Sequence, residues 1–597
     1  MKGAADTYEG RGLIADPIHQ YILYTRPGGI PGEATEQDVI DTPWAQRLRR
    51  IPQLQSARWV FPAAEHSRFQ HSLGAMHLSG RLAQQLYPSL RAVFAGDAPS
   101  APLLEELLRM AGLLHDIGHG PFGHFFDDNF LIDYNLTHEL VGQRIIREEL
   151  GDVLRALRRS PNGAFNADEV IDPEWICYLM GKAYTEPLPE HPKWLKFLKP
   201  LLSGVFTADN MDYVLRDAYM CGVAVGPIDI ERIIYYSFFS ENGLTLDRGG
   251  LQAFIMFLNA RFYMYTNVYY HRTTRGIDLH LKEIFRDTMR IAFPHDLGKG
   301  LHPYLHLTEW TLLEEVGRWH DAEETQRKRL GTEWRHILDR RLKWRMSHEV
   351  VLDLFEPRRG HAFLPAEVVE QRVRGFLPAR LREFPFKIDM ALQDPRPLNP
   401  LKMGDRQIYV YDSATRTVSM EPLTEILKYL PGKVAQCRIF AMSHEHDAEL
   451  GALPERVLGW HPAPGEWCAK EVVGHLIEAE RRGFAGRIRI ILARDHPALQ
   501  TWDQREVARE RRDCVRPVGA LLDELAALRR ESAALVRALG AADLDRGGDH
   551  PKVGFLPVRD LLHEWVHHDR NHIRQALATV QAYVWPAMGN SQKFAGE

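Results

Sequence analysis

The residues with the clearest capacity for chemistry lie in the stretch RMAGLLHDIGHGPFGHFF, from Arg109 to Phe126. The apolar residues before His115 recur at helical spacing, so we expect His115 and Asp116 where a helix meets the protein core. A buried imidazole beside a buried carboxylate is unfavourable unless each group is hydrogen-bonded, paired or bound to a cation. A divalent metal ion would satisfy both groups, so the stretch predicts a metal site. A core histidine bonded to a backbone carbonyl is the alternative for one residue, but it does not explain a cluster.

The segment 118–123, GHGPFG, is rich in glycine and contains a proline. This composition predicts a sharp turn after Asp116. The turn would bring His119 and His124 back towards the His115-Asp116 pair.

A second helix is expected over the stretch FPAAEHSRFQHSLGAMHLSGRLAQQL, where apolar residues again share one face. Its first part carries His66, Arg68 and His71 within about a turn and a half. A histidine from this helix could meet His115 and Asp116 across a helical bundle.

Two later segments carry further polar groups. Thr137 is a predicted N-cap, which places His138 in the first turn of a helix, although a histidine at a helix start is often only a surface residue. In LLSGVFTADNMDYVLRDAYMCGV, apolar residues separate Asp209, Asp212 and Asp217, so these carboxylates cannot all face water. At least one of them is expected to face the metal cluster.

Composition indicates a multidomain globular protein. The 597 residues predict two to four domains, and the 45% hydrophobic and 26% charged content is ordinary for a globular chain. Because 74 Lys and Arg against 79 Asp and Glu give a net charge of −5, no overall basic field favours nucleic-acid binding. The five cysteines form no CxxC pair, which disfavours a disulfide framework and a thiolate zinc site. Since no signal core or membrane-spanning run occurs, we expect a cytoplasmic protein that does not bind membranes.

The pattern along the chain predicts a mainly α fold in three parts. Long helical patterns cover residues 1–386, and short alternating segments, FKIDMAL, RQIYVYD, TRTVSME and QCRIF, occupy 387–441. Several helical runs follow over 442–597. We therefore expect a helical module, a small α/β lobe that completes it, and a C-terminal helical bundle.

The C-terminal bundle carries its own histidines. His475 lies mid-helix among apolar neighbours, and His568 and His572 are four residues apart on one helical face. Three histidines on two facing helices predict an open metal site that suits Zn or Ni, against the alternative of a purely structural bundle.

Several long, ordered motifs carry a family resemblance. QRLRRIPQL, FPAAEHSRFQHSLG, LLHDIGHGPFGHFF, THE and DNMDYVLRD resemble the HD phosphohydrolase superfamily, in its deoxynucleoside triphosphate (dNTP) triphosphohydrolase branch, over residues 14–440. The resemblance implies four metal ligands: His71, His115, Asp116 and Asp209. The C-terminal motifs resemble the DinB-like metal-binding four-helix bundles, with a shortened first helix and with His475, His568 and His572 at the three ligand positions.

The resemblance also implies catalytic residues. His119, His124 and His138 would lie at the triphosphate and the attacking water, with His138 as proton donor to the leaving 5′-oxygen. Asp127 would support His138, and Arg68 would hold phosphate. Asn210 stands where a phosphate-binding Lys or Arg is usual, and Arg272 replaces a Lys.

For the substrate and its regulation, the resemblance implies three further groups. Gln53 and Leu54 would line the deoxyribose and exclude a 2′-hydroxyl. The sugar 3′-hydroxyl and the base would contact a second group, Tyr213, Asp217, Tyr269 and His271. An activating nucleotide would bind at a third group, Asp41, Gln46 and Arg49, between subunits of a dimer or tetramer. The equal alternative is that this segment is only a capped amphipathic helix whose charges are solvated.

Two imidazoles and two carboxylates form a mixed nitrogen and oxygen site that suits Fe, Mn, Zn, Co, Ni or Mg. Such an ion lowers the pKa of bound water and screens phosphate charge. We expect hydrolysis of a dNTP to deoxynucleoside and triphosphate. The alternatives are a nucleotide-sensing regulatory protein, or hydrolysis of a nucleoside monophosphate, a ribonucleotide or guanosine tetraphosphate.

Overall fold

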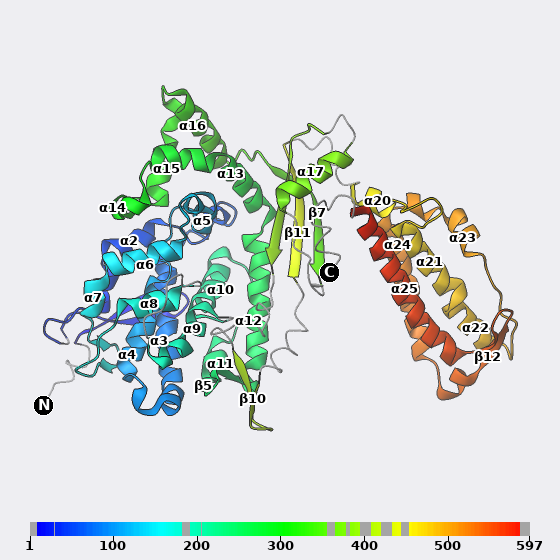
Figure 1. The fold of residues 1–597 in the computed structure, drawn as a ribbon, viewed down its shortest axis with the longest axis horizontal. Coiled ribbons are helices and arrows are strands. Elements are labelled where there is room, and N and C mark those ends of the chain that lie inside the picture. The colour runs from blue at the N-terminus through cyan, green and yellow to red at the C-terminus, as the bar shows by residue number, and fades with distance from the viewer. Residues whose placement is uncertain are drawn as a thin grey trace. The chain divides into compact units, whose positions relative to one another are not determined.

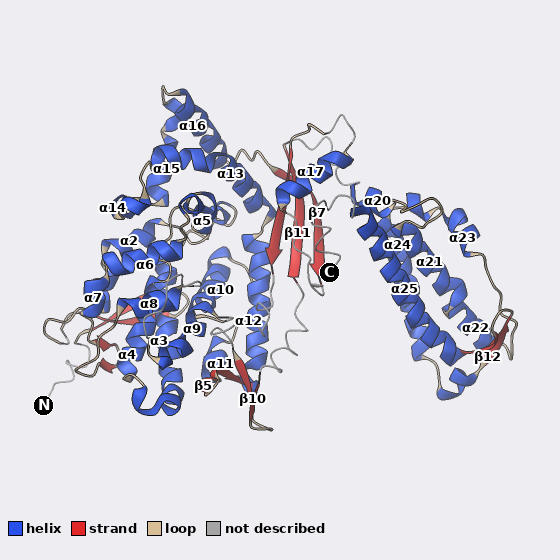
Figure 2. Ribbon diagram, in the orientation of Figure 1, coloured by secondary structure: helices blue, strands red, loops and turns tan. Residues whose placement is uncertain are grey.

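The computed structural model describes residues 9–28, 30–181, 191–204, 206–354, 365–377, 382–393, 408–419, 433–442 and 453–584. The chain divides into two compact units, Met1–Glu356 with Asp389–Met442, and Pro357–Ile388 with Ser443–Glu597. Helices form most of both units (Figures 1 and 2), which confirms the mainly α fold class. The expected boundary at residue 442 is followed by residues 443–452, which lie outside the described residues.

Three helices form the centre of the first unit. α3 (Arg68–Phe94) packs along α4 (Ala101–Leu114), and α10 (Ala208–Cys221) packs against α3. Their apolar faces belong to one large buried core. Each helix begins at a hydroxyl residue, because Ser and Thr side chains can accept from the free N–H groups of a first turn. These caps fix where each helix starts and therefore which side chains lie at its end.

Shorter helices surround this centre. They are α1 (Glu36–Ile40), α2 (Pro43–Arg47), α5 (His124–Asn129), α6 (His138–Glu148), α7 (Gly151–Arg155), α8 (Pro173–Met180), α9 (Lys193–Ser203), α11 (Ile230–Tyr235), α12 (Leu251–Met264), α13 (Arg272–Ala292), α14 (His302–Leu305), α15 (Glu309–Gly317) and α16 (Thr325–Leu338). A π-helical turn, Tyr265–Tyr269, separates α12 from α13. Such turns redirect side chains and are frequent at functional sites.

The strands of the first unit form small sheets. Two hairpins pair β1 (Arg11–Asp16) with β2 (Gln20–Thr25) and β3 (Arg159–Ser160) with β4 (Gly163–Ala164). A four-stranded sheet has the order β10-β9-β6-β5, from Thr417–Ser419, Tyr409–Asp412, Gly243–Asp247 and Ser237–Ser240. A three-stranded sheet has the order β7-β11-β8, from Arg345–Leu354, Lys433–Ala441 and Phe386–Gln393.

The segments expected as strands between residues 387 and 441 are all strands, but they do not form a sheet of their own. β9 pairs in parallel with β6, and β11 pairs with β7, so each sheet includes strands that precede residue 387. Local alternation indicates a strand but not its partner, because pairing depends on tertiary packing. The strands are therefore part of the first unit's own framework.

The second unit is built on long helices. α21 (Ala469–Glu478) continues through a π-helical turn, Ala479–Gly483, into α22 (Ala485–Ala493) and packs against α24 (Val518–Arg537) and α25 (Val558–Val584). Its shorter elements are α17 (Ala366–Phe376), α20 (Leu453–Leu458), α23 (Gln504–Arg511), β12 (Gly547–His550) and β13 (Gly554–Pro557). The first bundle helix, expected to be short, is described over Leu453–Leu458 as α20. Among the described residues of either unit, no helix combines the length and apolar character needed to cross a bilayer.

Candidate functional site

Four side chains from three helices converge at the centre of the first unit. His71 comes from α3, His115 and Asp116 follow α4, and Asp209 lies in the first turn of α10. His71 Nε2 lies 3.2 Å from His115 Nε2 and 3.1 Å from Asp209 Oδ1. His115 Nε2 lies 3.3 Å from Asp116 Oδ1. Ligand atoms about 3 Å apart fit around one divalent ion with bonds of about 2.0–2.2 Å.

The hydrogen bonds of the two imidazoles support a metal between them. His115 Nδ1 donates to the Gly112 carbonyl at 2.8 Å, and His71 Nδ1 donates to Asp212 Oδ2 at 2.8 Å. Each ring therefore points Nε2 at the other ring, and Nε2 is an acceptor unless it carries a proton or binds a metal ion. Two acceptors 3.2 Å apart repel each other unless a cation or a proton lies between them. The donor set and its orientation thus fit a divalent ion.

Asp212 holds the His71 ring and is not among the residues that line the cavity described below. Its carboxylate is fully buried and also binds Arg216, at 2.8 Å through each oxygen, and His19 at 2.6 Å. Burial raises the pKa of Asp212, but hydrogen bonds from His19, His71 and Arg216 outweigh it and hold the pKa well below the usual value. Asp212 is therefore ionised and orients a candidate ligand, as outer carboxylates do in metal sites.

The charges around the cluster favour ionised carboxylates. Arg68 donates to Asp116 at 2.5 Å. Burial raises the pKa of Asp116, but the positive charges of His115 and Arg68 lower it well below the usual value. The pKa of Asp209 is also lowered, because hydrogen bonds from His115 and His71 outweigh its burial. Both carboxylates are thus available as anionic ligands at neutral pH.

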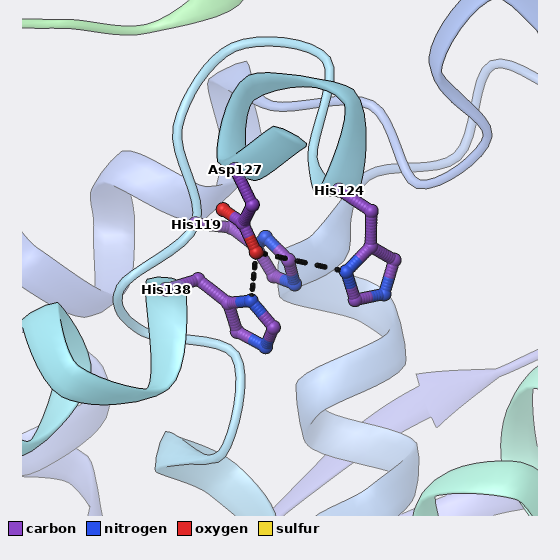
Figure 3. Close-up of side chains that lie close together, drawn as sticks. All are labelled: His119, His124, Asp127 and His138. Carbon is purple, nitrogen blue, oxygen red and sulfur yellow. Dashed lines mark hydrogen bonds and ion pairs between the residues drawn. The ribbon is translucent and has the colours of Figure 1, made fainter. Parts of the chain in front are cut away.

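A second cluster contains His119, His124, Asp127 and His138 (Figure 3). His138 Nδ1 donates to Asp127 Oδ2, and His124 Nδ1 lies 3.7 Å from the same oxygen. The rings of His119 and His138 stack at 3.7 Å. His138 begins α6 because the Thr137 hydroxyl caps this helix by accepting from Leu140, as the sequence predicted.

His119 is the fully buried member of this cluster. Burial and the nearby charge of Arg68 lower the pKa of His119 well below its usual value. Arg47, also fully buried, donates to the His119 carbonyl at 2.6 Å and so fixes the turn after Asp116. His119 is therefore a neutral ring that supports His138 by stacking.

A cavity of about 460 Å³ connects the two clusters with a third group of predicted residues. The predicted residues that line it are Gln53, Leu54, Arg68, His115, Asp116, His124, His138, Asp209, Tyr213, Asp217 and Tyr269. Its volume is in the range of small-molecule sites. Three predicted residues contact the lining residues without lining the cavity themselves. His71 contacts His115, His119 contacts His138 and Asp116, and Asp127 contacts His138.

His271, predicted to contact the base or sugar, is not among the residues that line this cavity. It caps α13 by accepting from the Thr273 N–H at 3.3 Å, and its ring packs edge-on against Phe61. Conversely, sequence analysis missed several residues that line the cavity, among them Glu139, Tyr265, Arg275 and Asp278. Arg275 and Asp278 carry opposite charges three residues apart on one helix, and this spacing is the signal from which the pair could have been predicted.

The part of the cavity wall that includes Gln53, Asp217 and Tyr269 carries amide, carboxylate and hydroxyl groups. The Tyr269 hydroxyl donates to Asp217 Oδ2 at 2.6 Å, and His66 Nε2 lies 2.8 Å from Asp217 Oδ1. The Gln53 Oε1 atom is buried and has no hydrogen-bond partner among the described residues. A buried acceptor without a partner is unfavourable, so this atom is available to a ligand donor.

Asp41, Gln46 and Arg49 lie together on the surface around α2. Gln46 Nε2 lies 3.5 Å from Asp41 Oδ1, and Arg49 Nε donates to Gln46 Oε1 at 2.7 Å. The Arg49 guanidinium also stacks 3.8 Å above the Phe69 ring. These contacts form a mutual network on the first unit.

The three predicted histidines of the second unit also converge. His475 on α21 and His568 and His572 on α25 have ring nitrogens within 4.8 Å of one another, and the Nε2 atoms of His475 and His568 lie 3.0 Å apart. Burial and the neighbouring histidines lower the pKa of His475 to about 3. Two further histidines of α25, His563 and His567, are exposed and do not belong to this cluster.

Comparison with known proteins places this geometry in a family. The uncharacterized protein YwfO of Bacillus subtilis is 32% identical over 328 residues, which cover 52% of this chain and 67% of that protein. The HD domain model matches residues 68–187, which include His71 and the His115-Asp116 pair. The chain belongs to the HD-domain phosphohydrolase family. An HD associated region matches residues 228–293, and the DinB superfamily model matches residues 442–576.

Other HD-domain relatives extend this similarity. The human deoxynucleoside triphosphate triphosphohydrolase SAMHD1 is 25% identical over 478 residues, covering 71% of this chain and 69% of that protein. The crystal structure of a hypothetical protein from Aquifex aeolicus matches with a TM-score of 0.53 and 26% identity, covering 74% of this chain and 98% of that chain. The chain spans 53% to 67% of the length of the first curated relatives that it matches.

Proposed function

We propose that the first unit hydrolyses deoxynucleoside triphosphates to deoxynucleoside and triphosphate. The observation that carries the proposal is the shared cavity, whose lining includes the metal-cluster residues His115, Asp116 and Asp209 together with His138 and Gln53. One cavity thus offers groups for the phosphates, the leaving oxygen and the sugar of a nucleotide. The similarity to SAMHD1 supports the same substrate class.

A divalent ion held by His71, His115, Asp116 and Asp209 would screen phosphate charge and lower the pKa of a water bound to it. The mixed donor set suits Fe, Mn, Zn, Co, Ni or Mg. Arg68 and His124 also line the cavity, where the Arg68 guanidinium supplies positive charge and the His124 ring can donate to phosphate oxygens. Phosphoryl transfer needs mainly such positioning and charge stabilisation.

His138 is the proposed proton donor to the leaving 5′-oxygen. Because its Nδ1 is engaged by Asp127, the proton for transfer resides on Nε2. Asp127 is ionised, since hydrogen bonds from His124 and His138 lower its pKa despite burial. The pair therefore fixes the orientation of the His138 imidazole.

The sugar and base would lie against the part of the cavity wall that includes Leu54, Gln53 and two tyrosines. Leu54 is 7% exposed and lines the cavity, so a 2′-hydroxyl there would be buried against an apolar side chain without a partner. The free Oε1 of Gln53 can accept from a sugar hydroxyl. Tyr213 and Tyr269 offer aromatic faces on the same wall.

The test is product analysis. Full-length protein loaded with Mn²⁺ is incubated with each dNTP, each ribonucleoside triphosphate and nucleoside monophosphates, and triphosphate, pyrophosphate and phosphate are separated by ion exchange. We expect triphosphate from dNTPs, and loss of its release to background in the double variant His115→Ala, Asp116→Ala. A matched control is His320→Ala with Asp321→Ala, which removes the same dipeptide from a surface turn.

Two results would contradict the proposal. Saturable dNTP binding without product would indicate a nucleotide sensor. Release of phosphate from monophosphates or guanosine tetraphosphate, without triphosphate release from dNTPs, would assign the HD site to another substrate.

We further propose that Asp41, Gln46 and Arg49 bind an activating nucleotide at a subunit interface of a dimer or tetramer. Mixed-substrate assays test this: Arg49→Ala should abolish any stimulation of one dNTP's hydrolysis by GTP or by another dNTP. If no nucleotide alters hydrolysis of another in the unaltered protein, the network is only structural.

We also propose that His475, His568 and His572 hold Zn²⁺ or Ni²⁺ independently of the HD site. The double variant His568→Ala, His572→Ala should lose one equivalent of metal by elemental analysis, and its triphosphate release should stay within a few-fold of the unaltered protein. Complete loss of hydrolysis with retained helicity would show that the two sites do not act separately.

A further inference from the structure

A third group of metal-capable side chains lies in the second unit, away from the three histidines. It consists of His461, Cys468 and Cys514, which are far apart in the sequence. His461 lies in the loop after α20, Cys468 caps α21, and Cys514 lies in a 3-10 turn, Asp513–Val515. We propose that these residues form a structural metal site of the thiolate class that binds Zn²⁺.

The geometry of the donors suits a small tetrahedral ion. The ring nitrogen of His461 and the two sulfur atoms lie within 4.8 Å of one another. Around a zinc ion with Zn–S bonds of about 2.3 Å and Zn–N bonds of about 2.0 Å, such atoms lie roughly 3–4 Å apart. His461 is exposed on a loop, so a small adjustment of its side chain brings the three atoms to that spacing.

Glu471 provides a carboxylate at the same place. Its Oε2 atom lies 2.9 Å from His461 Nε2 and accepts from the Cys468 backbone N–H at 3.0 Å. A carboxylate so placed can complete a four-ligand set or orient the histidine, as in known carboxylate-histidine-zinc arrangements. Two thiolates also neutralise the charge of a divalent ion, which favours binding at a partly buried place.

The surrounding contacts already bring the three segments together. Cys468 is fully buried, and the Cys514 thiol donates to the Gly459 carbonyl at 3.2 Å. The loop that carries His461 is thus joined to the turn that carries Cys514. A metal ion would add coordinate bonds that link these segments to Cys468, the N-cap residue of α21.

This site would differ from the three-histidine cluster in chemistry and in place. Cys468 and His475 belong to the same helix and are seven residues apart, which is about 10 Å along the axis. Thiolates select softer ions than imidazoles alone, and a closed four-ligand set is typical of structural zinc. The proposed role is to fix the start of the helix that presents His475.

Cobalt replacement tests the proposal on the full-length protein. Co²⁺ bound to thiolates gives a sulfur-to-metal charge-transfer absorption that histidine and carboxylate sites do not give. We expect this absorption with one equivalent of cobalt in the triple variant His475→Ala, His568→Ala, His572→Ala. It should vanish when Cys468→Ser and Cys514→Ser are added.

Matched variants keep the result interpretable. Serine is a favoured N-cap, so Cys468→Ser retains the start of α21, and circular dichroism verifies the fold. Cys437→Ser removes a half-buried cysteine of the first unit and should leave the absorption unchanged. His461→Ala should weaken Zn²⁺ binding about 10-fold or more in competition with a chelator.

The proposal is overturned if folded protein gives no thiolate absorption, or if the absorption persists without Cys468 and Cys514. It is also overturned if non-reducing mass spectrometry shows that the two sulfurs form a disulfide in the isolated protein.

Discussion

Asp212 accepts the Nδ1 hydrogen of His71 at 2.8 Å, so a fully buried carboxylate sets the direction in which His71 presents Nε2. The same carboxylate binds Arg216 and His19. His71 is therefore fixed by a charged network that connects α10 with the N-terminal hairpin.

Removing this carboxylate should weaken metal binding without removing a ligand. Asp212→Asn leaves His71 with a poorer acceptor, and loss of such outer partners typically lowers metal affinity about 10–100-fold. Chelator competition measures the affinity. The matched control is Asp16→Asn, which removes another partner of Arg216 but none of His71 and should leave metal affinity unchanged. An equal loss of metal affinity in both variants would show that the network affects metal binding only through the stability of the fold.

Gly74 lies one turn after His71, where no side chain has room. A Cβ atom there would lie 1.9 Å from Asp212 Oδ1 and 2.5 Å from an Arg216 nitrogen. Gly74→Ala should therefore displace Asp212, destabilise the first unit by about 1–3 kcal/mol and weaken metal binding. Urea unfolding and chelator competition are the measurements. Gly96→Ala, where a Cβ meets nothing within 4 Å, should change neither.

Asp127 orients the proposed acid without contacting the metal cluster. Asp127→Asn should lower kcat for triphosphate release about 10²-fold or more, because His138 loses its anionic partner, while metal content and KM stay close to those of the unaltered protein. Steady-state kinetics separates kcat from KM. Asp133→Asn removes an exposed partner of Arg286 on the following turn and serves as the control. An equal loss of metal would contradict a role confined to proton transfer.

Leu54 is expected to reject ribonucleotides. Leu54→Ala should reduce the ratio of kcat/KM for dATP over ATP by about 10-fold, because the truncated side chain leaves room for a 2′-hydroxyl. Parallel assays with both nucleotides measure the ratio. Leu13→Ala, an exposed leucine, is the control. An unchanged ratio would assign discrimination to another residue.

Glu309 predicts a pH dependence of stability. Its carboxylate accepts from the Phe122 N–H at 3.0 Å, and burial raises its pKa from 4.5 to about 7 despite the nearby Arg58. The folded state therefore binds the proton more tightly than the unfolded state. This stabilisation is present below pH 4.5 and is lost as the pH rises through about 7, by roughly 3 kcal/mol.

The comparison with Glu309→Gln isolates this effect. Relative to that variant, the unaltered protein should lose stability between pH 5 and pH 8, as read from hydrogen exchange of α15 during urea unfolding. Glu314→Gln, an exposed position on the same helix, should give a difference that does not vary with pH. A constant difference for Glu309→Gln would mean that its carboxyl is ionised throughout.

Helical spacing predicted that His115 and Asp116 lie where a helix meets the core, whereas the resemblance to the HD superfamily supplied His71 and Asp209 as further ligands. His115 and Asp116 follow an apolar helical pattern, and His138 follows a capping threonine. Local spacing could not predict contacts between distant segments. Asp212 was only one of three aspartates on a helix, and its role depends on His71, 141 residues away.

The cysteines are a second example of contacts that local spacing could not predict. Cys468 and Cys514 appeared scattered in the sequence, which argued against a thiolate site, yet folding places both sulfurs beside His461. Spacing motifs detect sites within one short segment, whereas this cluster is assembled from three. His271 stays a prediction: the resemblance places it at the base and sugar, and in the structure its side chain caps α13.

The parallel pairing of β6 with β9 limits how this chain can be divided. A fragment that ends at residue 386 would keep β6 and β7 but lose β9 and β11, their neighbours in the two sheets. Both retained strands would then expose unpaired backbone N–H and C=O groups, which favour edge-to-edge aggregation. A fragment of the first unit must therefore extend to residue 442 to keep both sheets complete, and a reporter inserted within β9 or β11 would separate a strand from its sheet.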